Sequence, residues 1–71
     1  MIDQHLVQAE ENVALGLKHI ARQTEIVAEL KRMGFVVAAG EATQLLKTFE
    51  EMQVEHEAHR DRHLRELQEA K

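Results

Sequence analysis

The stretch Met33-Gly34-Phe35-Val36-Val37-Ala38-Ala39-Gly40 decides the fold, because long helical patterns precede it and follow it. Gly34 stands where a helix ends in a residue with positive φ, and Phe35 can then fold back onto Leu30 inside the helix end. The chain has no proline and is rich in good helix formers, which suits two long helices. The stretch therefore predicts that the chain doubles back into a helical hairpin.

Apolar residues recur at intervals of seven in the segment before this turn. Asp3 is a suitable N-cap for it, and Ile2 and Val7 have the spacing of a hydrophobic staple. Gly16, in mid-helix, marks either a close helix crossing or a weak point. One heptad column contains larger residues: Leu6, Val13, Ile20 and Val27. A second column beside it is mostly alanine: Val7, Ala14, Ala21 and Ala28. A strict seven-residue repeat keeps one seam facing a partner helix.

The segment after the turn has the same period. Its three columns comprise Ala42, Phe49, His56, His63 and Ala70; Leu45, Met52 and His59; and Leu46, Gln53, Arg60 and Leu67. These columns are apolar near the turn and rich in histidine beyond Met52. The pattern predicts a dry core near the turn and a mixed polar seam toward the two ends of the chain.

We therefore predict one all-α domain over residues 1–71, an antiparallel two-helix hairpin similar to a coiled coil. The first helix is expected over about 3–33, the turn over about 34–38 and the second helix over about 39–70. If the chain folds about Val36 and Val37, Ile20 lies opposite Met52 or Gln53.

A hairpin of this size leaves apolar surface uncovered. A chain of 71 residues is near the lower size limit for independent folding, and without cysteine it has no disulfide to compensate. Self-association is the remaining common support, so we predict a homodimeric four-helix bundle. The expected interface comprises Val13, Ala14, Leu17, Ala21, Ala28, Phe49 and Met52. An unidentified protein partner on the apolar helix face is the alternative.

Composition argues against several classes of function. The net charge is −4, and the sequence contains two phenylalanines but no tryptophan or tyrosine. Both features disfavour nucleic acid as a partner, because such binding uses positive charge and aromatic stacking. No apolar run is long enough to span a membrane and no secretory signal is visible, so we expect a cytoplasmic protein. The sequence contains no phosphate-binding loop, metalloprotease motif or nucleophile elbow, and it has no serine. We therefore expect no enzymatic activity and no cofactor.

Three histidines share one face of the second helix, at spacings of three and four: His56, His59 and His63. Helical histidines and carboxylates at such spacings bind metal ions in bundles, and the expected pairing places His63 opposite Glu10. One interpretation is therefore a zinc or iron site on these four residues. A second is that amphipathic rings border the core, and a third is a seam that gains charge near about pH 6. His5 and His19 have no comparable neighbours in the pattern and are expected at the surface.

Four stretches carry a resemblance to other proteins: His19-Ile20-x-x-Gln23-x-x-Ile26-Val27-x-x-Leu30, then Gly34, Leu45-Leu46-x-x-Phe49-Glu50-x-x-Gln53, and His56-x-x-His59-Arg60-Asp61-Arg62. Within positions 13–65 the chain resembles a group of short bacterial proteins, mainly proteobacterial. That group has no established activity, so the resemblance implies a bacterial origin and carries over no functional residue. The expected function is that of a small non-enzymatic structural or interaction protein. The alternatives are a metal-binding bundle and a regulator that binds a partner protein.

Overall fold

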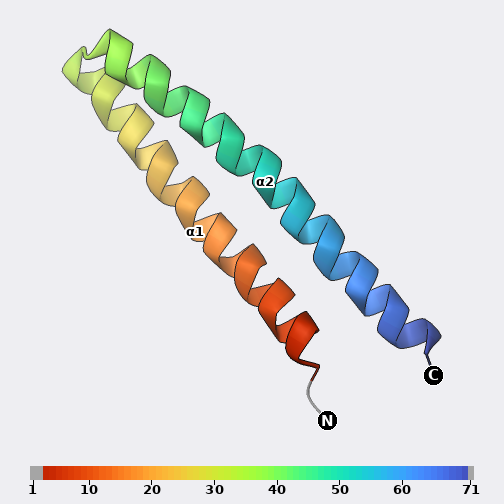
Figure 1. Ribbon diagram of the computed structural model, residues 1–71. Coiled ribbons are helices and arrows are strands. Elements are labelled where there is room, and N and C mark those ends of the chain that lie inside the picture. The colour runs from red at the N-terminus through yellow and green to blue at the C-terminus, as the bar shows by residue number, and fades with distance from the viewer. Residues whose placement is uncertain (1–2, 71) are drawn as a thin grey trace.

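Two long antiparallel helices form the molecule (Figure 1). The computed structural model describes residues 3–70, and Ile2 of the expected hydrophobic staple lies outside that range. Helix α1 spans Gln4–Met33 and helix α2 spans Val36–Glu69, with no strand in the described range. The molecule measures 56 × 17 × 11 Å, and both described ends of the chain lie far from the turn. The predicted all-α hairpin is confirmed.

Asp3 caps the start of α1. Its carboxylate accepts hydrogen bonds from the backbone N–H groups of His5 at 2.8 Å and Leu6 at 3.1 Å. These bonds satisfy two of the donors that the first helical turn leaves free. The bond from Leu6 is the main cause that lowers the pKa of Asp3, and the nearby imidazole of His63 contributes.

Gly34 ends α1 in the left-handed conformation, with φ of 82°. Its N–H donates to the carbonyl of Lys31 at 3.1 Å, and the N–H of Phe35 donates to the carbonyl of Leu30 at 3.0 Å. These two bonds define a Schellman motif, which satisfies carbonyls that the helix end would leave unpaired. The predicted return of Phe35 to Leu30 is thus confirmed as a main-chain bond, while the Phe35 side chain stays 56% exposed.

The turn is shorter than the sequence suggested. Helix α2 begins at Val36, three residues before the expected start at 39, and the N–H of Ala39 already bonds the carbonyl of Phe35 at 2.8 Å. No side chain caps this start. Because the sequence carries no Ser, Thr, Asp or Asn there to mark the boundary, pattern reasoning placed the helix too late.

The residues between the helices follow alternating steps of three and four, as in a coiled coil. On α1 they are Leu6, Ala9, Val13, Gly16, Ile20, Gln23, Val27 and Leu30. On α2 they are Ala39, Ala42, Leu46, Phe49, Gln53, His56, Arg60 and His63. All are buried or half-buried, and they are termed the seam here. The larger of the two predicted columns of α1 therefore faces α2, whereas the alanines of the other column are exposed.

Two buried glutamines fix the register of the helices. Gln23 Nε2 donates to the carbonyl of Ala42 at 2.9 Å, and Gln53 Nε2 donates to the carbonyl of Val13 at 3.0 Å. The side chains are 7% and 5% exposed. The expected pairing of Gln53 with Ile20 is therefore wrong by more than one helical turn. The cause is the short turn, since the chain reverses at Gly34 and not at positions 36 and 37.

Candidate functional site

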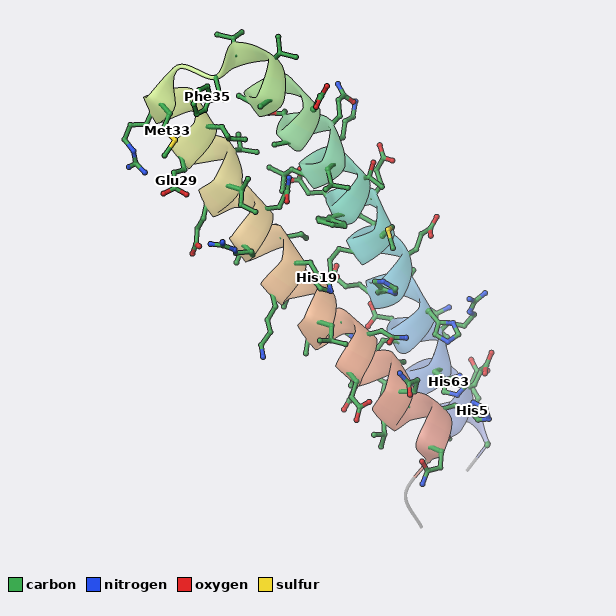
Figure 2. The ribbon with its side chains drawn as sticks, turned by 60° about the vertical axis from the view of Figure 1, so that its left-hand side comes forward. His5, His19, Glu29, Met33, Phe35 and His63 are labelled. Atoms are coloured by element: carbon green, nitrogen blue, oxygen red, sulfur yellow. The ribbon has the colours of Figure 1, made fainter. Side chains whose placement is uncertain are left out.

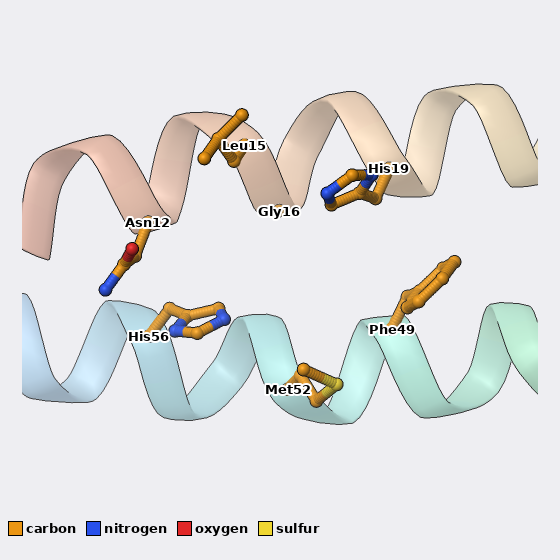
Figure 3. A pocket seen from close by; sticks show the side chains of 7 residues that line it. All are labelled: Asn12, Leu15, Gly16, His19, Phe49, Met52 and His56. Atoms are coloured by element: carbon orange, nitrogen blue, oxygen red, sulfur yellow. The ribbon is translucent and has the colours of Figure 1, made fainter.

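An open groove lies between α1 and α2, about halfway along the hairpin (Figure 3). It encloses about 300 Å³ and is termed the groove here. Its lining comprises Asn12, Leu15, Gly16 and His19 from α1 and Phe49, Met52 and His56 from α2. The lining combines apolar carbon with two imidazoles and one amide, and it contains no carboxylate, lysine or arginine.

The groove presents apolar side chains to solvent. Leu15 is 51% exposed and Met52 is 46% exposed, one from each helix. The ring of His19 lies against that of Phe49, with centroids 5.7 Å apart and planes tilted by 31°. Exposed apolar side chains that cluster in this way mark interaction surfaces more often than isolated ones do.

The residues expected at the dimer interface do not share one face. Val13 is 7% exposed, because it packs within the seam of a single hairpin and offers little surface to a second copy. Phe49 and Met52 line the groove. The remaining four are exposed and, by the coiled-coil geometry, lie on the side of the hairpin away from the groove: Ala14, Leu17, Ala21 and Ala28. A second hairpin packed on one side would therefore cover only one of these sets.

The histidines are spread along the hairpin. His56 lines the groove, whereas the rings of His59 and His63 stack nearer the open end, with centroids 5.7 Å apart. The ring of His63 also lies 5.6 Å from that of His5 (Figure 2). The expectation that His5 has no comparable neighbour is therefore wrong, whereas the expectation that His5 and His19 lie at the surface is confirmed. The first expectation failed because the expected register was displaced along the helices.

His63 lies close to two acidic groups. Its Nε2 lies 3.9 Å from Asp3 Oδ1, and its Nδ1 lies 3.6 Å from Glu66 Oε2. Asp3 thus stands where the sequence placed Glu10, which is exposed. Within residues 3–70, no three side chains of His, Cys, Asp or Glu converge on a point where they could hold a metal ion. The four residues of the predicted metal site, His56, His59, His63 and Glu10, therefore do not come together in this structure.

The sequence pattern does not assign three of the groove residues to a site: Asn12, Leu15 and His19. The sequence does carry a signal for two of them. Asn12 and His19 are seven residues apart, and each directly precedes a residue of the seam. The second heptad column of the seam on α1 contains Gly16 and Gln23. Because a glycine and a polar residue give no apolar signal, the pattern does not reveal this column or the residues beside it.

Neither helix contains, within the described residues, a stretch long and apolar enough to cross a membrane. Comparisons of the chain with protein-family models, with curated proteins and with solved structures gave no match. The function proposed below therefore stands on the residues and their geometry.

Proposed function

We propose that this chain is a non-enzymatic structural and interaction module that functions as a homodimer, with two hairpins forming a four-helix bundle. The observation that supports this most strongly is the amount of surface that one hairpin leaves uncovered. The accessible surface is 5699 Å² for a mass of 8.2 kDa. A compact monomer of that mass exposes roughly 4,500 Å², so the excess is about 1,200 Å². An obligate homodimer buries about 1,000 Å² or more on each partner, which matches this excess.

The core within one hairpin is correspondingly thin. Among the described residues, the buried apolar side chains are small or medium in size: Ala9, Val13, Val27 and Ala39. No side chain in that range is completely buried, while Met33, Leu45 and Met52 are each about half exposed or more. A small domain of this kind usually gains stability from a second layer of packing.

The groove suits packing better than catalysis. It is open to solvent and lined largely by carbon, and its two imidazoles lie on different helices, one of them against a phenyl ring. An active site more often has convergent polar groups inside an enclosed pocket. We therefore propose that the exposed apolar surface serves helix–helix association.

Sedimentation equilibrium and thermal unfolding test this proposal. Over about 1 to 100 µM protein at about pH 8, we expect a species of twice 8.2 kDa whose melting temperature falls on dilution. A fully helical species of 8.2 kDa, whose melting temperature does not change on dilution, would contradict the proposal. A monomer that is partly unfolded at all these concentrations would instead favour the alternative of a regulator that folds on a different protein.

A further inference from the structure

The two sides of the hairpin differ in charge. In an antiparallel coiled coil, one flank of the seam on α1 adjoins the matching flank on α2. The flank that contains the groove comprises His5, Asn12, His19, Ile26 and Met33 on α1 and Ala38, Leu45, Met52, His59 and Glu66 on α2. The opposite flank comprises Asp3, Glu10, Leu17, Thr24 and Lys31 on α1 and Val36, Thr43, Glu50, Glu57 and Leu64 on α2. These sets are termed the groove flank and the charged flank here.

The groove flank lacks the charges that usually border a two-helix seam. Only Glu66, at the open end, carries a fixed charge there, whereas the charged flank has four carboxylates and one lysine. Flanking positions of an isolated two-helix coiled coil are commonly Glu or Lys, because they face water. Met33, Leu45 and Met52 of the groove flank are 60%, 45% and 46% exposed. The groove flank therefore has the composition of a surface that another helix pair covers.

A second copy of the chain fits this surface in one simple arrangement. The groove lies near mid-length, over residues 12–19 of α1 and 49–56 of α2. A twofold axis that passes through the groove at right angles to the helices would place the two grooves against each other. It would also align the two groove flanks over the whole hairpin, and the excess of about 1,200 Å² per chain is similar to the area that each partner of a stable homodimer buries.

We propose that the groove flank is the dimer interface, with groove against groove about this axis, and that the enclosed imidazoles of His19 and His56 make the dimer dissociate in acid. This inference rests on the proposed homodimer and assigns its contact face and its regulation. Both copies contribute their imidazoles near the axis, so protonation places several positive charges in a space that the contact removes from water. Burying a charge without a partner is costly, and like charges repel.

The surroundings of His19 supply no acid that would hold its proton in the groove. Along α1, Lys18 precedes it, and Arg22 follows by one turn with its guanidinium 3.3 Å from Glu25. From α2, the phenyl ring of Phe49 faces the imidazole. The nearest fixed charges on its own helix are therefore those of Lys18 and Arg22.

The surroundings of His56 are similar on the side of the groove. From α1 it faces the amide of Asn12 and the backbone of Gly16, neither of which titrates. The titratable or charged residues next to it or one turn away on α2 lie outside the groove lining: Glu55, Glu57, His59 and Arg60. Arg60 bonds its neighbour Asp61 at 3.0 Å. We therefore expect the dimer at about pH 8 and its loss in mild acid, where an uncompensated positive charge would be enclosed by the contact.

Leu15→Glu and Leu17→Glu test the contact face as a matched pair. The two leucines are 51% and 54% exposed, lie two residues apart on α1 and occupy opposite sides of the hairpin. At about pH 8 we expect Leu15→Glu to weaken dimerisation about tenfold or more, and Leu17→Glu to change it less than about threefold. Circular dichroism checks that both variants remain helical. If Leu17→Glu is as damaging as Leu15→Glu, the interface lies elsewhere and the inference is overturned.

Histidine substitutions test the response to acid. We expect the dissociation constant of the native dimer to rise about tenfold or more between about pH 8 and about pH 5.5. The double variant His19→Gln/His56→Gln should have nearly the same constant at both values. The control His63→Gln, which changes a seam histidine at the open end outside the groove flank, should respond as the native chain does. A native dimer that is indifferent to acid, or a groove variant that keeps the full response, would overturn this part of the inference.

The two proposals fail in different ways. A native chain that is monomeric at about 100 µM and about pH 8 contradicts the homodimer itself. A native chain that dimerises but tolerates Leu15→Glu leaves the homodimer standing and removes the groove flank as its contact face.

Discussion

At the scale of single residues, Gly16 and Gln53 form one unit. A Cβ at position 16 would occupy the space that the amide of Gln53 already fills. The same amide donates to the carbonyl of Val13 at 3.0 Å, and its Oε1 is buried without a hydrogen-bond partner in the described part of the chain. A glycine inside a helix costs about 1 kcal/mol against alanine. Of the two interpretations open for Gly16, the structure supports a close contact between helices.

Gly16→Ala and Gly40→Ala are therefore expected to act in opposite directions. Both glycines lie inside helices, but a Cβ at position 40 meets nothing within 4 Å. Gly40→Ala should raise the free energy of unfolding by up to about 1 kcal/mol. Gly16→Ala should lower it by about 1 kcal/mol, because displacing the Gln53 amide costs more than the helix propensity gains. Denaturant unfolding at one fixed protein concentration measures both changes.

The double variant Gly16→Ala/Gln53→Ala separates the steric effect from helix propensity. With the amide absent, alanine at position 16 should stabilise the chain relative to Gln53→Ala alone. If Gly16→Ala destabilises both backgrounds equally, the contact with Gln53 is not the cause.

At the scale of the helices, the ends of α1 are well determined by local chemistry and the start of α2 is not. Asp3 and Gly34 cap α1 with bonds that their residue types predict. Phe35, at the start of α2, makes no side-chain cap. For that reason the bounds of α1 predicted from the sequence are close to those observed, whereas the predicted turn is longer than the observed one. The error at the turn then displaced every expected cross-helix pair, including the pairing of His63 with Glu10.

Gly34→Ala tests the turn. The left-handed φ of 82° is strained for a residue with a side chain, although a Cβ there meets nothing within 4 Å. We expect a loss of about 1 kcal/mol in the free energy of unfolding, from the backbone alone. Gly34→Asn should cost less, since Asn tolerates this conformation best among the other residues. Equal losses for the two variants would point to a packing effect and contradict this explanation.

Asp3→Ala tests the cap and its dependence on pH. The pKa of Asp3 is lowered in the folded chain, chiefly by the hydrogen bond from Leu6, so the ionised form stabilises the fold. That contribution is fully present above the ordinary value of 3.8 and is lost as the pH falls through the lowered pKa. We expect Asp3→Ala to lower the melting temperature at neutral pH and to melt closer to the native chain in strong acid. Asp3→Asn, which keeps an acceptor oxygen, should lose less at neutral pH; an equal loss would contradict the capping role.

At the scale of the whole molecule, the hairpin was predictable and its surface was not. Heptad columns led to two helices and one seam, because apolar residues such as Val13 and Val27 mark the seam. Gln23 and Gln53 belong to the same seam, but a polar side chain carries no signal of burial unless its partner is known. The groove depends on both the register and the seam, so its residues could not be assembled from the pattern alone.

Metal analysis tests the alternative based on histidine. For protein purified without an affinity tag, we expect less than about a tenth of an equivalent of transition metal and no change of melting temperature in chelator. This expectation follows from the distribution of His56, His59 and His63 along α2, where the carboxylates of Asp3 and Glu66 lie near His63. A full equivalent of metal whose removal lowers the melting temperature would show that the open end rearranges to bind it.

The two buried glutamines have a consequence for the history of this sequence. Each amide binds a main-chain oxygen, of Ala42 or of Val13, which every amino acid at those positions would supply. Mutations that accumulate at these two acceptor positions can therefore leave the alignment of the helices intact. Gly16 and Gln53 have no such freedom, and we expect them to covary in descendants of this chain.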